Sequence, residues 1–335
     1  MTIGTVPGRG FAIDAPDVLE VSFRRAPLSE RNHEPLLVTI GDDTVGPVIG
    51  LFYDGPSTPE ELAGPPDLTP AHGHVCDNFR IVMKGELWVG RERYHHGDFR
   101  IQRSARPYGA DGDAPHEEGN WRVISFADRR GFRTRFTNPE LRAQGENDEA
   151  IARQREMTGW DILPPNDPGI NGLATTLDKP WSKVQHIDAS FAECDSWPVI
   201  GDDGRVCVNL MAHHEVGPIY IVQRTPAGAV ATPGMTIGSD VFRCVIGGGY
   251  GEYAMGDCRF QASGVAWNEV VAGAGGLDEL IVIGDRRGLA SASDNAWIAR
   301  IRELVAPLQA ELDALDALAV RPGVDDVDRP ELHAV

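Results

Sequence analysis

Two histidines separated by one glycine, His72 and His74, have the spacing in this chain that most directly suggests chemistry. Side chains at positions i and i+2 of a β-strand point to the same face, so both imidazoles would lie on one wall. Neutral imidazole binds divalent metal ions, and it also takes up and releases protons near neutral pH. The pair therefore predicts a metal site or an acid–base site. The alternative is a surface loop that happens to contain two histidines.

The sequence around this pair resembles the two motifs of the cupin superfamily. His72-Gly73-His74 is followed by Asn78 and Gly85, and then by Gly97-Asp98 and Pro107-Tyr108-Gly109. In that family the first motif holds two histidines, an acidic residue and a glycine, and the second opens with Gly-Asp and ends near a histidine. The resemblance implies a β-barrel with His72 and His74 at metal-ligand positions. Asn78 stands in place of the acidic ligand and Tyr108 in place of the last histidine, so the metal site is only partly matched.

The remaining metal ligands are left open by the sequence. Asn78 offers only a carbonyl oxygen, and Asp77 should face the other side of an ideal strand unless a β-bulge turns it inward. Tyr108 could bind as phenolate if a metal drives its deprotonation. His116 lies in a polar insertion that could fold over the barrel mouth. The candidate metal ligands are therefore His72, His74, Asn78 and His116. The metals expected are iron or manganese, with zinc or nickel as alternatives.

The same residues would also serve an enzyme without a metal. An imidazole and a phenol in an apolar cavity can move protons on a carbonyl or enol substrate, with His72, His74 and Tyr108 as the catalytic groups. Three functions follow as hypotheses. The first is a metal-dependent, oxygenase-type enzyme acting on a small acidic or aromatic molecule. The second is a metal-free lyase, isomerase or cyclase. The third is a bicupin that binds a ligand without catalysis.

Four sequence blocks recur in the same order in both halves of the chain. Gly46-Pro47, Asp77-Asn78-Phe79-Arg80, Gly97-Asp98 and Asp128-Arg129-Arg130-Gly131 reappear as Gly217-Pro218, Asp240-Val241-Phe242-Arg243, Gly256-Asp257 and Asp285-Arg286-Arg287-Gly288. The offsets are 171, 163, 159 and 157 residues. Such an internal repeat predicts two copies of one fold. We therefore predict an all-β protein of tandem jelly-roll, cupin-type barrels (double-stranded β-helices) with a few accessory helices.

The repeat also sets the expected domains. They are an N-terminal barrel at 1–137, a helix and Pro/Trp-rich linker at 138–200, a C-terminal barrel at 201–290, and a C-terminal helix and acidic tail at 291–335. In the second barrel, the positions that match the ligand positions of the first hold Met235, Ile237, Val241 and Trp267. These side chains do not bind hard or borderline divalent cations. We expect the second barrel to brace the first.

The repeated arginines at 80/243, 100/259 and in the two Arg-Arg pairs are interpreted as structural, because they recur in the half that lacks the histidines. They would pair with Asp77 and Asp240 or with Asp128 and Asp285. The doublets His95-His96 and His213-His214 are interpreted as surface residues or as residues that lie behind the site without touching its ligand.

Two helices are expected outside the barrels. Asn138 and Pro139 form a helix start, and the helix would run to about Met157. Asp294 and Asn295 would cap a second helix whose apolar residues recur every three or four positions, with a kink at Pro307. This helix should cover a barrel, or else pair with a second subunit in a homodimer. The chain end from Arg321 is read as a frayed acidic tail.

The composition narrows the class of protein. Nucleic acid and anionic membrane surfaces are poor partners for a net charge of −19, since both attract positive charge. The 5 cysteines are odd in number and lack C-x-x-C spacing, which favours free thiols in a reducing compartment. Neither a basic, apolar N-terminal leader nor a long apolar run is present. We therefore expect a cytoplasmic protein with a small-molecule substrate.

Overall fold

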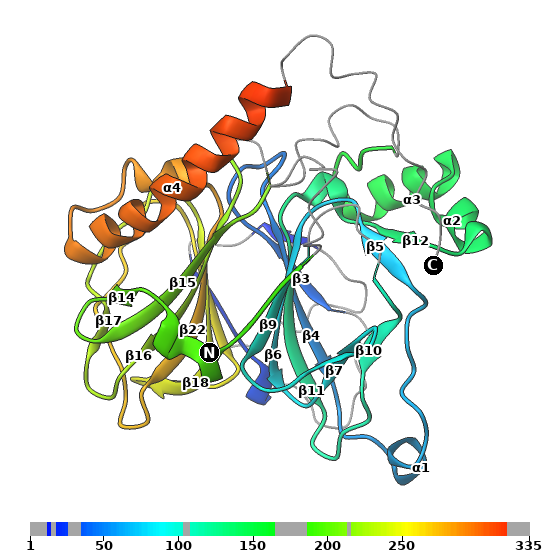
Figure 1. Cartoon of the computed structure of the whole chain (residues 1–335), viewed down its shortest axis with the longest axis horizontal. Coiled ribbons are helices and arrows are strands. Elements are labelled where there is room, and N and C mark those ends of the chain that lie inside the picture. Colours follow the sequence, from blue (N-terminus) through cyan, green and yellow to red (C-terminus); the bar gives the residue numbers. More distant parts are fainter. Residues whose placement is uncertain are drawn as a thin grey trace.

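Two large β-sheets face each other at the centre of the molecule (Figure 1). The structure is a computed structural model, and it describes residues 12–14, 18–25, 35–102, 108–164, 186–212 and 216–319. The first sheet has the order β1-β3-β4-β11-β6-β9-β13 and the second the order β14-β15-β16-β22-β18-β20-β2. All neighbouring strands are antiparallel except β1 and β3.

The strands of the first large sheet are β1 (Ala12–Asp14), β3 (Leu36–Thr39), β4 (Val48–Asp54), β6 (Asn78–Lys84), β9 (Asp98–Gln102), β11 (Asn120–Phe126) and β13 (His186–Ser190). Those of the second are β2 (Val18–Ser22), β14 (Val199–Ile200), β15 (Gly204–Leu210), β16 (Ile219–Thr225), β18 (Val241–Tyr250), β20 (Asp257–Gln261) and β22 (Leu277–Ile283), with β19 (Tyr253–Ala254) paired to β18. Smaller sheets join β7 (Leu87–Val89), β8 (Glu92–Tyr94) and β10 (Asp111–Asp113), β5 (His72–His74) and β12 (Thr134–Phe136), and β17 (Val230–Thr232) and β21 (Val270–Val271).

The predicted duplication is confirmed strand by strand. The run β3-β4-β11-β6-β9 in the first sheet has the same order as β15-β16-β22-β18-β20 in the second. Each half folds as an all-β jelly-roll barrel, as the repeat predicted. The expected boundaries at 137 and 200 remain a prediction, but strand pairing crosses both: β13 from the linker joins β9, and β2 from the N-terminal part joins β20.

Alternation along the strands divides the side chains between two environments. On β6, Phe79, Ile81 and Met83 enter the largest apolar cluster, which lies between the two large sheets, whereas Val82 belongs to a cluster inside the first barrel. The Phe79 ring stacks on Tyr220 of the second sheet with 5.2 Å between centroids. The two barrels therefore share one core, and the alternate residues of the same strands are left to fill each barrel.

Repeated aspartates and arginines hold the seam between the barrels. Asp240 of the second half accepts a hydrogen bond from the Gly41 amide at 2.9 Å, and Asp77 accepts the corresponding bond from Ala212 at 3.4 Å. Gly41 has a φ of 74°, and a Cβ there would lie 2.5 Å from the Gly284 backbone. This close approach requires glycine. The expected structural role of Asp77 is met by a contact across the seam.

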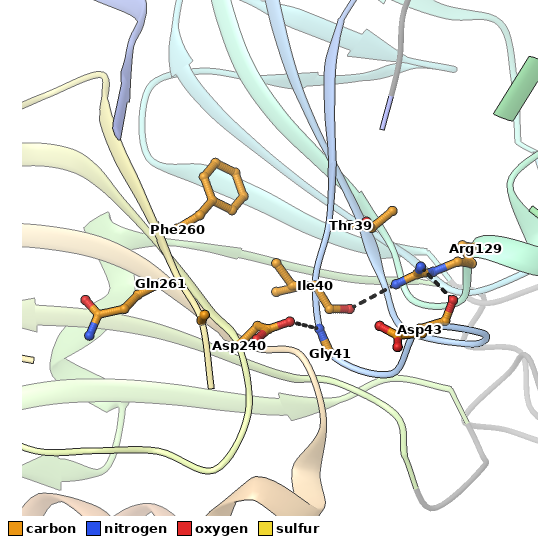
Figure 2. Close-up of a pocket in the computed structure, with 9 residues that line it drawn as sticks. Thr39, Ile40, Gly41, Asp43, Arg129, Asp240, Phe260 and Gln261 are labelled. Atoms are coloured by element: carbon orange, nitrogen blue, oxygen red, sulfur yellow. Dashed lines mark hydrogen bonds between the residues drawn. The ribbon is translucent and has the colours of Figure 1, made fainter. Parts of the chain in front are cut away.

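In both halves, the second arginine of the Arg-Arg pair binds the aspartate two residues before it. Arg130 pairs with Asp128 and Arg287 with Asp285, each at 2.7 Å, as predicted. Arg129 instead donates to backbone carbonyl groups of the loop before β4, including that of Ile40. A pocket of about 160 Å³ lies in this seam. Figure 2 shows Arg129 and Asp240 among the residues that line it.

The helices differ in part from the expectation. The predicted helix at 138–157 is two helices, α2 (Pro139–Gly145) and α3 (Asp148–Thr158), because Asn147 caps a new helix start. A short helix, α1 (Pro59–Leu62), was not predicted. The C-terminal helix α4 (Ala296–Ala319) continues through Pro307 and buries Trp297, Ile298 and Ile301 against the second barrel, so it has the covering role. None of the helices within the described ranges is long and apolar enough to span a membrane. The acidic tail beyond Ala319 lies outside the described residues.

The seam contacts lead to a stability prediction. Replacing Asp240 by Ala leaves the amides of Gly41 and Ser263 without their acceptor, so the free energy of unfolding should fall by about 1–3 kcal/mol. Urea denaturation measures the change, and Asp202→Ala at an exposed position is the control. An equal, small effect of both substitutions would contradict the structural role of Asp240.

Candidate functional site

The predicted histidine pair lies inside the first barrel. His72 and His74 form β5, which pairs with β12, and their exposed fractions are only 4% and 7%. Both rings share one face of the strand, as the spacing predicted, with 5.2 Å between their centroids. Phe126 packs against His74 and Phe136 against His72. The surface-loop alternative is therefore wrong.

The tautomer of both rings is set by backbone carbonyl groups. Nδ1 of His72 lies 2.7 Å from the Pro70 oxygen, and Nδ1 of His74 lies 3.4 Å from the Arg133 oxygen. A carbonyl oxygen can only accept, so each Nδ1 carries the proton and each Nε2 presents a lone pair. Both Nε2 atoms are thus acceptors that face the barrel interior.

Tyr108 lies beside β5 and contacts both imidazoles. Its backbone forms an isolated β-bridge with His72, and its hydroxyl oxygen lies 2.9 Å from Nε2 of both His72 and His74. A phenol has one proton to donate, so it can satisfy only one of the two imidazoles at a time. The second imidazole needs another donor.

Arg80 on β6 supplies that donor and occupies the centre of the cluster. Its Nη2 donates to the Tyr108 hydroxyl and lies 3.3 Å from Nε2 of His74. Nη1 donates to Asp111 at 2.7 Å, and Nε donates to the Asn78 side-chain oxygen at 3.2 Å. Arg80 is 2% exposed, so these protein groups, and not bulk water, stabilise its charge.

The buried cluster shifts the proton affinities of its members. Burial lowers the pKa of His72 below its ordinary value, against the opposing effect of Asp111. Burial, with Arg80 and His72, lowers the pKa of His74 much further. Burial raises the pKa of the Tyr108 phenol, although Arg80 works in the other direction. Burial alone would lower the pKa of Arg80, but Tyr108 and Asp111 raise it overall. Near neutral pH the site thus holds neutral imidazoles, a protonated phenol and a guanidinium cation.

A divalent metal ion does not fit these residues as they are arranged. The two Nε2 lone pairs have the orientation that a metal needs. However, the donors they face are the Tyr108 hydroxyl and the Arg80 guanidinium, a permanent cation that would repel the ion. Among the described residues, no group of three or more His, Cys, Asp and Glu side chains gathers in a way that could hold a metal.

The other predicted ligands are placed as follows. Asn78 is fully buried, and its side-chain oxygen accepts a hydrogen bond from Arg80, while its side-chain nitrogen has no hydrogen-bond partner among the described residues. His116 accepts a hydrogen bond at Nδ1 from the Glu118 amide, 3.2 Å away in its own turn, and is not brought to the histidine pair. His95 and His96 are exposed, as expected. His213 and His214 lie outside the described residues.

Sequence reasoning missed two acidic residues of the first barrel. The insertion after Tyr108 was expected to cover the barrel mouth, but it forms β10, and Asp111 and Asp113 lie two positions apart on it. Asp111 binds Arg80, and Asp113 pairs with Arg122. Burial raises the pKa of Asp113 to about 7, against the charge of Arg122 and with a hydrogen bond to Asp54. The i, i+2 spacing of the two aspartates was the available signal.

The second barrel repeats the geometry with different side chains. The β-bridge between His72 and Tyr108 has its counterpart between Met235 and Trp267, which confirms the alignment of the two halves. Arg243, the counterpart of Arg80, is 2% exposed and pairs with the fully buried Glu279. It also donates to Thr232 at 3.0 Å. Arg243 has a structural role in this barrel, but its partner is Glu279, not Asp240 as expected. The other strand arginine, Arg259, lies 3.6 Å from Glu20.

Solved structures of low sequence identity match this chain over most of its length. Among solved structures, a candidate dioxygenase from Nostoc punctiforme matches with 10% identity and a TM-score of 0.49, over 84% of this chain and 87% of that one. Salicylate 1,2-dioxygenase from Pseudaminobacter salicylatoxidans matches with 15% identity and a TM-score of 0.44, over 78% and 73%. Oxalate decarboxylase from Bacillus subtilis matches with 13% identity and a TM-score of 0.38, over 80% and 72%.

The activities named are those of these three proteins, and identities this low do not carry them over to this chain. No protein-family profile matches the sequence, and no curated protein matches it.

The pKa of Asp113 predicts a pH-dependent stability. The folded protein holds a proton on Asp113 up to about pH 7, whereas the unfolded chain releases it near 3.8. The folded state binds more protons between these values, so this group makes stability fall as pH rises through the window. In urea denaturation between pH 4 and 7, Asp113→Asn should show a smaller loss than the unmodified protein. The exposed Asp67→Asn should keep the original slope, and an unchanged slope in Asp113→Asn would contradict the prediction.

Proposed function

We propose that the first barrel is the active site of an enzyme that moves protons on a small organic acid without a metal ion. The observation that carries this proposal is the Tyr108 hydroxyl, held 2.9 Å from the Nε2 atoms of His72 and His74 and bound by the Arg80 guanidinium. This set pairs an imidazole nitrogen that can accept a proton with a hydroxyl that can donate one, beside a fixed positive charge. Isomerisation, elimination and ring closure next to a carbonyl group need such a pair.

His72 is the proposed base. Its Nδ1 is fixed on the Pro70 carbonyl, so Nε2 is the atom that accepts a proton from a C–H or O–H next to the substrate's carbonyl group. His72 is less deeply shifted than His74, whose pKa is lowered further by Arg80 and by His72 itself. His74 therefore suits the role of orienting Tyr108.

Tyr108 and Arg80 are the proposed acid side of the site. When the substrate replaces the hydrogen bond between Tyr108 and His72, the phenol can donate to the oxygen that becomes negative as the proton leaves carbon. The guanidinium bound to the phenol oxygen stabilises charge there. The side-chain nitrogen of Asn78, beside Arg80, has no partner in the described ranges and offers a further donor for a carboxylate oxygen.

The test follows hydrogen exchange at carbon and does not require the product to be known. A panel of small hydroxy, keto and aromatic acids is incubated in D₂O with protein treated with a chelator, and the loss of C–H signals is followed by NMR. Tyr108→Phe and His72→Gln should each slow the exchange by about 10²–10⁴-fold, because each removes a proton-transfer group. Tyr53→Phe is the matched control, since it removes a buried hydroxyl that has no hydrogen-bond partner within the described part of the chain and lies in the apolar core between the two large sheets.

Equal exchange by the unmodified protein and both site variants would reject the proposal. A panel member bound tightly but never exchanged would favour the non-catalytic ligand-binding function.

The lowered pKa of His72 also predicts the pH profile. The base form of His72 persists below its ordinary value of 6.5, so the acid limb of kcat/KM for exchange should have its midpoint below pH 6.5. Rates measured on one substrate from pH 8 down to the end of this limb provide the check. A midpoint at or above pH 6.5 would contradict His72 as the base.

A metal-dependent oxygenase is the second candidate. The observation in its favour is that both Nε2 lone pairs face a common centre, with Nδ1 fixed on carbonyl groups as in metal-binding histidines. This function, with iron or manganese, requires Arg80 to leave the centre. Restoration of activity by Fe²⁺ or Mn²⁺ after chelation would favour it over the metal-free proposal.

A further inference from the structure

We propose that Arg80 takes the place of a divalent metal ion in the first barrel and keeps such ions out of a donor set that could otherwise bind one. The inference concerns the same site as the proposed function and rests on it only for the absence of a metal requirement.

The cluster is rich in acceptors and requires a cation. Nε2 of His72, Nε2 of His74 and the Asp111 carboxylate are all acceptors near one point, and Asp111 lies 3.6 Å from Nε2 of His72. The histidines are almost completely buried, so water can satisfy them only poorly. Buried acceptors need a donor or a positive ion. Arg80 supplies several donors and one charge from a single side chain.

An ion and the guanidinium cannot share this centre. A transition-metal ion would lie about 2.0–2.2 Å from each histidine nitrogen, closer than the Tyr108 hydroxyl lies now. It would therefore displace that hydroxyl and come to lie against Nη2 of Arg80, which is 3.3 Å from Nε2 of His74. Two adjacent positive charges in a buried site repel each other strongly. Binding the ion thus requires removal of Arg80.

The second barrel also has a buried arginine at this depth, with Met235 and Ile237 at the positions of the histidines. Arg243 occupies the matching strand position, and Glu279 and Thr232 take up its donors. A guanidinium at this depth is therefore a feature of both barrels. The first barrel adds His72 and His74 to it, whereas the matching positions of the second barrel hold Met235 and Ile237. The donor set of the first barrel is therefore suitable for a transition metal, unlike the set at these positions of the second.

The experiment titrates Co²⁺ into untagged, chelator-treated full-length protein. Visible absorption reports imidazole ligation, and elemental analysis after gel filtration counts bound ions. Arg80→Gln removes the charge but keeps a polar side chain, and it should bind one Co²⁺ per chain roughly 100-fold or more tightly than the unmodified protein. Arg80→Lys keeps the charge and should bind as weakly as the unmodified protein.

Two controls locate the ion. Arg80→Gln combined with His74→Ala should lose the Co²⁺ spectrum, and Arg243→Gln in the second barrel should not gain it. If Arg80→Gln is unfolded by itself, refolding with Co²⁺ should restore structure, because metal binding and folding are coupled. A chain that stays unfolded with Co²⁺ would overturn the inference, as would a folded Arg80→Gln protein that binds no ion.

The outcomes separate this inference from the proposed function. Failure of Arg80→Gln to bind Co²⁺ shows that the donor set is not competent, and it leaves the metal-free chemistry untouched. Tight Co²⁺ binding by the unmodified protein through His72 and His74 overturns the inference. If C–H exchange in that protein is also abolished by chelation, the proposed metal-free function fails as well.

Discussion

Burial of the two large sheets on both faces is the constraint on which the rest of this structure depends. One face of each sheet joins the shared core between the barrels, where Phe79 stacks on Tyr220. The opposite face lines a barrel. Because side chains alternate along a strand, every second residue is placed inside a barrel whatever its polarity. Polar residues at these positions must find partners within the barrel itself.

The arginines of the central strands show this constraint most clearly. Arg80 lies directly across from Arg100 in the strand register, and Arg243 lies across from Arg259. Like charges opposite each other are unfavourable unless each has its own acceptors. Arg80 is satisfied by Asp111, Asn78 and Tyr108, whereas Arg243 is satisfied mainly by Glu279 on the neighbouring strand. Two copies of one fold thus neutralise equivalent charges by different routes.

This difference explains why the chemistry is expected in only one barrel. The partner of Arg243 is a carboxylate, and the two form a buried ion pair. The partners of Arg80 include a phenol that touches two neutral imidazoles. The positive charge therefore acts on groups that can exchange protons. The proposed reactivity of the first barrel thus depends on an arginine that is shared among several weak acids and bases.

The sequence alone determined the duplication and the barrel class, because the repeated blocks are collinear. It also determined that His72 and His74 share one face, because side chains two residues apart on a strand point the same way. It also gave the pairing of Arg130 with Asp128, which are two residues apart. It did not give Asp111 as the partner of Arg80, since the two are 31 residues apart and meet only when β10 folds against the barrel. The pairing of β2 with β20 and of β13 with β9 could not be predicted either, because these edge strands come from segments that are distant in the sequence. Contacts made through barrel closure depend on three-dimensional proximity, and only the tertiary structure decided them.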